Sequence, residues 1–463
     1  MTDVQKLAQF TASRSFGDLS SDALRELKIR LLDSLGCAIG ALEGPPIRRI
    51  RSHTEDFGGR GLATLVGGGR TAPDRASFFN SALVRYLDFN DSYLAKGETC
   101  HPSDNIGSVL AAGEYRGIDG KTFLTALGIA YQVQCRLSDV APVRAKGFDH
   151  TVQGAYGAAA GAAYALGLSP EKTANAIAIA ATAYNALRVT RTGNLSNWKG
   201  LAFPSTGWTS THSAFLAMRG ITGPEEVFEG NKGFKESIAG DFEIDWSKED
   251  LERVTRTILK KYNAEIHSQA TLEGLIELRE EHDFDPADIE KITLHTFDVA
   301  YHIIGGGEEG GKKNIRTKEE ADHSLPYMMA AAVLDGNVLP AQYESDRILR
   351  DDIQTLLKKV EVYENPDYSA RFPDQEANDM AIHLRDGRLL EKDKVDYEGF
   401  HTRPASWAFV GQKFRNLAAP FAEADHLDRI VELVRDFENH TLADLMDLLG
   451  QVNPVSSKTL TLA

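Results

Sequence analysis

The chain has 463 residues, of which 42% are hydrophobic, and its 67 acidic and 51 basic residues give a formal net charge of −16. The chain is longer than a typical domain with a single hydrophobic core. This length predicts two domains, or one domain that carries an insertion. An acidic balance without basic blocks argues against nucleic acid and against an anionic membrane surface as partners. An anionic ligand must therefore be bound by a local pocket.

The three cysteines, Cys37, Cys100 and Cys135, contain no closely spaced pair. The sequence therefore predicts neither a disulfide framework nor a zinc or iron–sulfur site. The first residues contain no apolar signal core and do not have the composition of a transit peptide. The longest apolar-looking run, 154–168, consists mostly of Ala and Gly, so we expect a cytoplasmic protein without a membrane span.

The first part of the chain, from about 19 to 219, has a helical texture rich in small residues. Ser20 is a suitable N-cap for a helix that carries leucines on one face. Gly154, Gly157 and Gly161 recur at spacings that let helices approach closely, so they predict tight helix packing.

After Ser268 the pattern changes to short alternating segments that indicate strands. The alternation occurs at 292–294, at 360–362 and at 380–384, where it runs into the hairpin signal Asp386-Gly387. A capping box from Thr317 to Glu320 and an apolar pattern near 348–357 predict intervening helices.

From Arg403 onward the texture is helical again, notably at 427–437 and 442–449. We therefore predict a mainly α protein. An all-helical domain would comprise residues 1–268 plus 404–463, with an inserted α+β domain at 269–403.

Two glycine-rich segments resemble phosphate-binding motifs only formally. Gly67–Gly69 follows an apolar run, but no second strand follows the next helix, so a surface hairpin is the better interpretation. The segment 306–312 lacks the required hydroxyl and carries Glu308 and Glu309, which would repel phosphates. A Gly-x-Ser-x-Gly elbow is also absent, which disfavours covalent acyl chemistry.

The segment 85–105 contains more proton-transfer groups than any other stretch of this length. Asp88 and Asp91 are three residues apart at the expected end of a helix, where both carboxylates would share a face. His101 precedes Pro102, which is a natural first helical residue. His101 is therefore expected at a helix N-terminus, where backbone amides favour anions and disfavour a protonated imidazole.

His150 and His267 also lie at predicted helix starts, next to Thr151 and Ser268. If the helix ends converge, their amides would bind a polycarboxylate while the histidines supply acid and base, without a metal. Each histidine alone could equally be a capping or packing residue, so the hypothesis depends on the combination.

Several cationic residues and a tyrosine could complete such a site. Lys199 lies in a polar loop, where it could bind a carboxylate or stabilise an enolate, or simply be solvated. Tyr327 follows Pro326 in a predicted first helical turn, and its hydroxyl could donate to a leaving oxygen, although a core role is equally plausible. Candidates for bidentate carboxylate binding, with exposed surface as the alternative, are Arg188, Arg191 and Arg403.

Four motifs spread over nearly the whole chain resemble the MmgE/PrpD family. They are Leu87-Asp88-Phe89-Asn90-Asp91, His101-Pro102-Ser103-Asp104-Asn105, the Lys199 segment with the Ala-Phe-Leu-Ala and Gly-Pro that follow it, and Ala321-Asp322-His323-Ser324-Leu325-Pro326-Tyr327. The resemblance implies an all-helical domain with an inserted α+β lid, usually in a homodimer. It also implies a small polycarboxylate substrate and no metal or organic cofactor.

By position, the resemblance places the catalytic groups on Asp91, His101, His150, Lys199, His267 and Tyr327. The expected substrate-binding residues are Asp88, Ser103, Asn105, Arg188, Arg191 and Arg403.

The Asp-Phe-Asn-Asp and His-Pro-Ser-Asp-Asn motifs are similar to the 2-methylcitrate dehydratase branch. The decarboxylase branch has a threonine where this chain has Ala95, and a different sequence after the His-Pro. We therefore expect dehydration of 2-methylcitrate, and of citrate as a second substrate, in propionate catabolism. The alternatives are cis-aconitate decarboxylation, epimerisation or isomerisation within the family, and a non-catalytic helical scaffold outside it.

Overall fold

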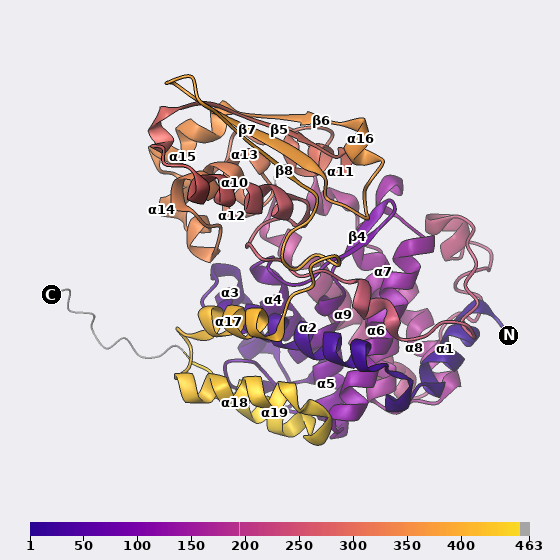
Figure 1. The fold of residues 1–463 in the computed structure, drawn as a ribbon. Coiled ribbons are helices and arrows are strands. Elements are labelled where there is room, and N and C mark those ends of the chain that lie inside the picture. Colours follow the sequence, from indigo (N-terminus) through magenta and orange to yellow (C-terminus); the bar gives the residue numbers. More distant parts are fainter. Residues whose placement is uncertain (194, 454–463) are drawn as a thin grey trace. The chain divides into compact units, whose positions relative to one another are not determined.

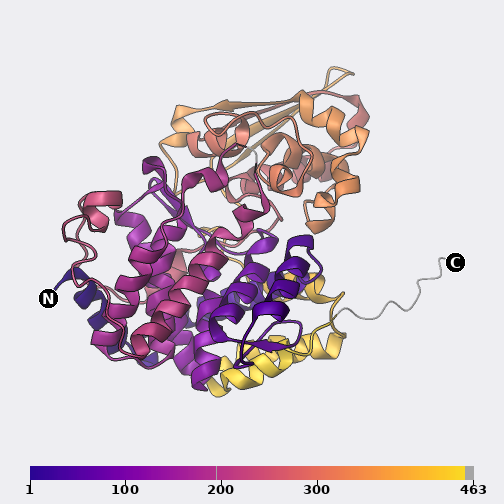
Figure 2. The same ribbon diagram turned by 180° about the vertical axis from the view of Figure 1, so that it is seen from behind.

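The computed structural model describes residues 1–193 and 195–453, which form two compact units (Figure 1 and Figure 2). The first unit comprises Met1–Arg188, Gly200–Thr257 and the described residues from Ser406 onward. The second comprises Val189–Lys199, without residue 194, and Ile258–Ala405. The insertion expected at 269–403 lies within this second unit.

The first unit is built almost entirely from helices. These are α1 (Asp3–Ser13), α2 (Ser21–Gly40), α3 (Pro45–Phe57), α4 (Pro73–Tyr86), α5 (Ile106–Arg116), α6 (Gly120–Val140), α7 (Thr151–Ala165), α8 (Pro170–Ala183), α9 (Ala202–Met218), α17 (Trp407–Ala418), α18 (Ala424–Arg435) and α19 (Leu442–Leu449). Helix α17, which follows the insertion in sequence, packs on α2 of the same unit (Figure 1).

Two short antiparallel hairpins interrupt the helices of this unit. One pairs β1 (Ala63–Thr64) with β2 (Arg70–Thr71), and the other pairs β3 (Tyr93–Ala95) with β4 (Glu98–Cys100). Gly67, Gly68 and Gly69 in the first hairpin all have positive φ, which glycine adopts without a steric cost. The hairpin interpretation of this glycine run is confirmed.

Helices α6 and α7 pack closely because α7 presents glycines to its neighbour. A Cβ atom on Gly157 would lie 2.8 Å from the carbonyl oxygen of Ala130, and one on Gly161 would lie 3.1 Å from that of Ala126. The predicted close packing of the glycine series is therefore confirmed, and it brings the start of α7 next to the 102–105 turn.

The second unit contains a four-stranded sheet covered by helices, with strand order β6-β5-β7-β8. Strand β5 (Ile289–Thr296) pairs in parallel with β6 (Val360–Glu364) and antiparallel with β7 (Asn378–Leu384), which forms a hairpin with β8 (Leu389–Lys394). The helices are α10 (Gln269–Glu281), α11 (Asp298–Ala300), α12 (Lys318–Ala321), α13 (Leu325–Asp335), α14 (Ser345–Ile348), α15 (Asp351–Leu356) and α16 (Pro366–Ser369).

The buried core of this unit lies between the sheet and α10 and α13. The predicted strands and the Thr317–Glu320 capping box are confirmed. Alternate residues of β7 are buried, as its sequence alternation indicates. The protein is thus mainly α with an α+β insertion, and none of its described helices is both long and apolar enough to cross a bilayer.

Replacement of Gly157 by alanine tests the close packing of α6 and α7. The new methyl group would press on backbone rather than on a movable side chain, so we expect a destabilisation of about 1–3 kcal/mol. Differential scanning calorimetry should show a lower unfolding temperature. Gly17→Ala is the matched control because its Cβ would meet only Ser15 Oγ at 3.7 Å; an equal shift in both variants would contradict this account.

Candidate active site

Two of the predicted histidines lie together in the first unit. His101 is the N-cap of a 3₁₀ turn, Pro102–Asn105, that leads directly into α5, and His150 is the N-cap of α7. Both side chains are buried, with 7% and 2% residue exposure. Their ring centroids are 5.3 Å apart in an edge-to-face arrangement. A small substrate could contact both rings at once.

The backbone fixes the tautomer of His101. Its Nδ1 lies 2.8 Å from the carbonyl oxygen of Asp91 and 3.0 Å from Ser92 Oγ. Because a carbonyl oxygen only accepts, Nδ1 donates a hydrogen and the neutral ring carries its lone pair on Nε2. His101 is therefore arranged to take or give a proton at Nε2.

The Asp91 carboxyl holds the turn that carries His101. Its Oδ1 accepts hydrogen bonds from the amide of Ser103 at 3.1 Å and from Ser103 Oγ at 2.6 Å, and its Oδ2 accepts one from the Tyr131 hydroxyl at 2.8 Å. Complete burial raises the pKa of the Asp91 carboxyl, although these hydrogen bonds oppose the shift. Asp91 thus positions His101 through its carbonyl group, and its side chain braces the turn.

The expected helical pairing of Asp88 with Asp91 is wrong. Helix α4 ends at Tyr86, and Asp88 adopts a left-handed φ of 57°, so the two carboxylates do not share a helix face. Asp88 instead forms a buried ion pair with Arg85. The chain leaves the helix here because Asp tolerates the left-handed conformation better than most residues.

Ser103 and Asn105, predicted to bind substrate, are completely buried and bonded to the protein itself. Ser103 donates to Asp91 and accepts from Asn90, while Asn105 donates to Gln134 Oε1 at 2.6 Å. These contacts stabilise the turn, and substrate binding by the two residues stays a prediction.

Lys413 on α17 anchors the turn from the far end of the sequence. Its Nζ donates to the carbonyl oxygen of Phe89 at 2.7 Å and pairs with Asp33 Oδ1 at 2.7 Å. It also lies 3.7 Å from the centroid of the Phe89 ring. This buried cation ties α2 and α17 to the segment between Asp88 and Asp91.

Asp149, Glu98 and Arg188 lie near His150, and only Arg188 was predicted from the sequence to belong to the site. Asp149 Oδ1 accepts the amide of Thr151 at 3.1 Å and lies 3.6 Å from His150 Nε2. Glu98 on β4 is also buried, and burial raises the pKa of its carboxyl against the lowering effects of the Val143 amide and the Arg188 charge. Arg188, a predicted substrate ligand, is thus an electrostatic neighbour of this group.

In the second unit, Lys199 belongs to a buried cluster of charges. Its Nζ donates to Asp322 Oδ1 at 2.8 Å and lies 2.9 Å from His323 Nδ1, while Lys318 Nζ donates to Asp322 Oδ2 at 2.8 Å. Burial raises the pKa of the Asp322 carboxyl, but the two lysine charges overcome this and hold it far below its ordinary value.

A further lysine, Lys312, lies near this cluster. Burial and the charge of Lys199 lower the pKa of Lys312, while Glu309, Glu265 and Asp322 oppose the shift. The cluster therefore contains both lysines and carboxylates, and Lys199 is its buried cation. The Ala-Asp-His-Ser motif marked this segment, but only the structure shows that Asp322 is the partner of Lys199.

His267 and Tyr327 lie in the same second unit. His267 is in a 3₁₀ turn before α10, with its ring edge-on to Phe297 and Phe372 and its Nε2 3.8 Å from Glu265 Oε1. The Tyr327 hydroxyl donates to the carbonyl oxygen of Gln342, and burial raises the pKa of this hydroxyl. The hydroxyl therefore stays protonated, with its one hydrogen bonded to Gln342, and its assistance to catalysis stays a prediction.

Arg191 and Arg403 differ in their surroundings. Arg191 is buried in a 3₁₀ turn with Arg188. Arg403 is bound by acidic side chains, with NH1 2.7 Å from Glu273 Oε2 and 3.2 Å from Asp396 Oδ1. These contacts are structural ion pairs, of which the shorter is with Glu273 on α10.

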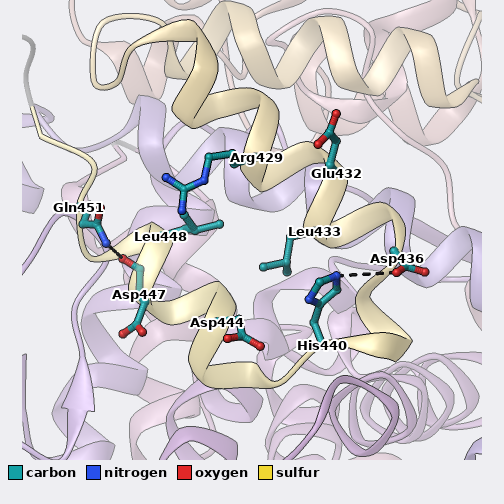
Figure 3. A pocket seen from close by; sticks show the side chains of 9 residues that line it. All are labelled: Arg429, Glu432, Leu433, Asp436, His440, Asp444, Asp447, Leu448 and Gln451. Atoms are coloured by element: carbon teal, nitrogen blue, oxygen red, sulfur yellow. Dashed lines mark hydrogen bonds and ion pairs between the residues drawn. The ribbon is translucent and has the colours of Figure 1, made fainter.

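A separate cavity of about 640 Å³ lies at α18 and α19 (Figure 3). Its acidic lining residues are Glu432, Asp436, Asp444 and Asp447, against one arginine, Arg429, and His440. The net negative lining would repel a polycarboxylate. The histidine pair of α5 and α7 is the better candidate for chemistry on an anion.

Comparison with known proteins agrees with the sequence motifs. Residues 5–247 match the model of the MmgE/PrpD N-terminal domain, and residues 262–439 match that of the C-terminal domain. The chain belongs to the MmgE/PrpD family.

Curated relatives within this family include two activities. The chain is 29% identical over 447 residues to 2-methylcitrate dehydratase of Escherichia coli K12, covering 88% of each chain. It is 28% identical to the mitochondrial 2-methylcitrate dehydratase of Yarrowia lipolytica, over 93% of this chain and 86% of that one. It is also 26% identical to cis-aconitate decarboxylase of Mus musculus, over 91% and 88%. These relatives support an enzyme of the lyase class.

The Glu273 ion pairs predict a pH dependence of stability. Burial alone would raise the pKa of Glu273, but Arg403, Lys394 and Lys261 lower it to about 2. A carboxyl with a depressed folded-state pKa contributes stability that is complete above its unfolded pKa and is lost as pH falls toward the folded value.

Urea unfolding should therefore show Glu273→Gln to be less stable than the wild type at pH 7, with the difference shrinking between about pH 4.5 and 2. Glu281→Gln, which removes an exposed carboxylate, serves as the control and should have little effect. A difference that persists unchanged at pH 3 would contradict the ion-pair explanation.

Proposed function

We propose that the protein is a hydro-lyase that dehydrates 2-methylcitrate, and citrate as a second substrate, to a cis-aconitate-type product. The observation that supports this most directly is the pair of buried imidazoles, His101 and His150, with ring centroids 5.3 Å apart at adjoining helix starts. The names of the bacterial and yeast relatives favour the same reaction.

Dehydration of a hydroxy-polycarboxylate needs three things. A base must remove a weakly acidic proton next to a carboxylate, an acid must protonate the departing hydroxide, and positive charge must stabilise the developing enediolate. His101 and His150 are suitably placed to exchange the two protons. The amides of Ser103 and Thr151 are already bound by Asp91 and Asp149, so the helix starts favour the substrate's negative charge through the dipoles of α5 and α7.

The second unit offers groups that suit carboxylate binding. Lys199 is buried with Asp322, and Lys318 and Lys312 lie nearby, so its ammonium group suits a substrate carboxylate. We propose that Lys199 and His267 bind substrate carboxylates and that Tyr327 assists from the insertion. The homodimer and the role in propionate catabolism are further proposals that follow from the resemblance.

The most direct test is to mix the purified, metal-stripped protein with 2-methylcitrate and to follow the ultraviolet absorbance of a conjugated enoate. We expect absorbance to rise without added metal. A signal that appears only after iron or zinc is restored would contradict the cofactor-independent mechanism.

The same preparation distinguishes the alternatives, of which decarboxylation is favoured by the mouse relative. Release of carbon dioxide from cis-aconitate would identify a decarboxylase. Exchange of substrate hydrogen with deuterated solvent, without enoate, would identify an isomerase or epimerase. Either result would replace the dehydratase proposal.

Replacement of His101 by glutamine should reduce kcat/KM by about 100-fold or more, because general acid–base catalysis contributes at least that factor. The folded state should be retained, as judged by circular dichroism. His440→Gln, in the acidic cavity of Figure 3, is the control and should keep wild-type activity. Full activity in His101→Gln would leave only a structural role for this residue.

Lys199→Gln should mainly raise KM, by about 10-fold or more, because it removes a charge-assisted contact to a substrate carboxylate. Steady-state kinetics at several substrate concentrations would separate KM from kcat. Lys313→Gln, which removes an exposed lysine of the same unit, should change neither parameter. An unchanged KM in Lys199→Gln would refute its role in substrate binding.

A further inference from the structure

The two histidines of the candidate active site have electrically different neighbours. His101 Nδ1 contacts a carbonyl oxygen and a hydroxyl, which are neutral dipoles. The nearby Asp91 carboxyl is buried, and burial raises its pKa, which favours the uncharged acid. Neither neighbour strongly favours a charged imidazole at His101.

His150 instead lies beside a carboxylate. Its Nε2 is 3.6 Å from Oδ1 of Asp149, a residue with no solvent exposure. The amide of Thr151 donates to the same Oδ1 at 3.1 Å, at the positive end of α7. Both the amide and the helix end favour the ionised form of Asp149, and an ionised carboxylate at this distance favours a protonated His150.

The other groups near His150 act in both directions. The positive end of α7 and the charge of Arg188 oppose a protonated imidazole, whereas the Asp149 carboxylate, 3.6 Å from Nε2, favours it. Glu98 faces Asp149 from β4, and burial favours its uncharged form. The charge of Arg188 lowers the pKa of Glu98. The backbone places Arg188 close to Asp149, because the Arg188 amide donates to Gly147 O and the Asp149 amide donates to Ala186 O, both at 2.9 Å. The His101 ring also faces His150 edge to face. Asp149 is thus an acidic group that directly faces His150.

We propose that Asp149 is a positioning residue that keeps His150 protonated, so that His150 is the acid of the reaction and His101 is the base. This inference rests on the proposed dehydration. It assigns the two proton-transfer roles, which the sequence pattern leaves open because both histidines occupy helix starts.

With this assignment, every proton and electron pair of the dehydration is accounted for. The lone pair on His101 Nε2 takes the proton next to the carboxylate, and the released electron pair forms the carbon–carbon double bond. The carbon–oxygen bond breaks, and the departing hydroxide takes a proton from His150 to become water. Turnover leaves His101 charged and His150 neutral, and a proton passed back between the two neighbouring rings restores the starting state.

Asp149→Asn is a sharp test because the asparagine side-chain oxygen can still accept the amide of Thr151, as Asp149 Oδ1 does, and therefore retains the start of α7. Histidine labelled with ¹³C at Cε1 would report the titration of His150 by NMR, with its signal assigned by its loss in His150→Gln. We expect His150 of the full wild-type chain to titrate above the ordinary histidine value of about 6.5. In Asp149→Asn its midpoint should fall by about one pH unit or more.

Glu98→Gln is the matched control, since it removes a neighbouring carboxyl whose pKa is raised by burial, and His150 should keep its wild-type midpoint there. The alkaline limb of the kcat–pH profile should move to lower pH in Asp149→Asn and stay in place in Glu98→Gln. A merely structural role for Asp149 would lower activity without moving this limb.

An unshifted His150 midpoint in Asp149→Asn, or a His150 that is already neutral at pH 7 in the wild type, would overturn the proposal. The NMR titration needs no substrate, so it is independent of the activity assay. A shifted midpoint in a protein that produces no enoate would support the action of Asp149 on His150 and would refute the dehydratase function instead.

Discussion

The hydrogen bond from His101 Nδ1 to the carbonyl oxygen of Asp91 determines how the first unit can do chemistry. It selects one tautomer and turns the reactive nitrogen away from the backbone. The Asp91 side chain is itself held by Ser103, from a neighbouring turn, and by Tyr131, from α6. A buried polar network that is satisfied in this way is rigid, and rigidity is what a proton-transfer group requires.

In the second unit the candidate site residue Lys199 contacts a charged side chain, whereas His101 in the first unit contacts a backbone carbonyl group. Lys199 and Asp322 are buried together beside the partly buried Lys318, and a buried ion pair is costly unless its members satisfy one another. These lysines supply local positive charge in a chain whose net charge is −16.

The features that could be predicted from the sequence are those with local causes. Proline after His101 and the caps before α2 and α12 fix helix starts within a few residues, and strand alternation marks β5, β6 and β7. The parallel pairing of β5 with β6 and the strand β8 left no equally clear local signal.

The partners of the functional groups were less predictable because they come from distant segments. Tyr131 is 40 residues from Asp91, and Asp322 is 123 residues from Lys199. The expectation of a helical Asp88 failed for a local reason, since an ion pair with Arg85 and a left-handed turn replaced the last helical turn. Asp149 was visible next to His150, but its burial and its distance from Nε2 required coordinates.

The contact between Lys413 and Phe89 spans 324 residues and has a consequence for biogenesis. The ribosome synthesises the turn that carries Asp91 early, but the cation that anchors it emerges only after the whole insertion. A nascent chain that has released only the first helices therefore lacks this anchor. The order of translation thus delays completion of the turn that carries Asp91 until both units have been made.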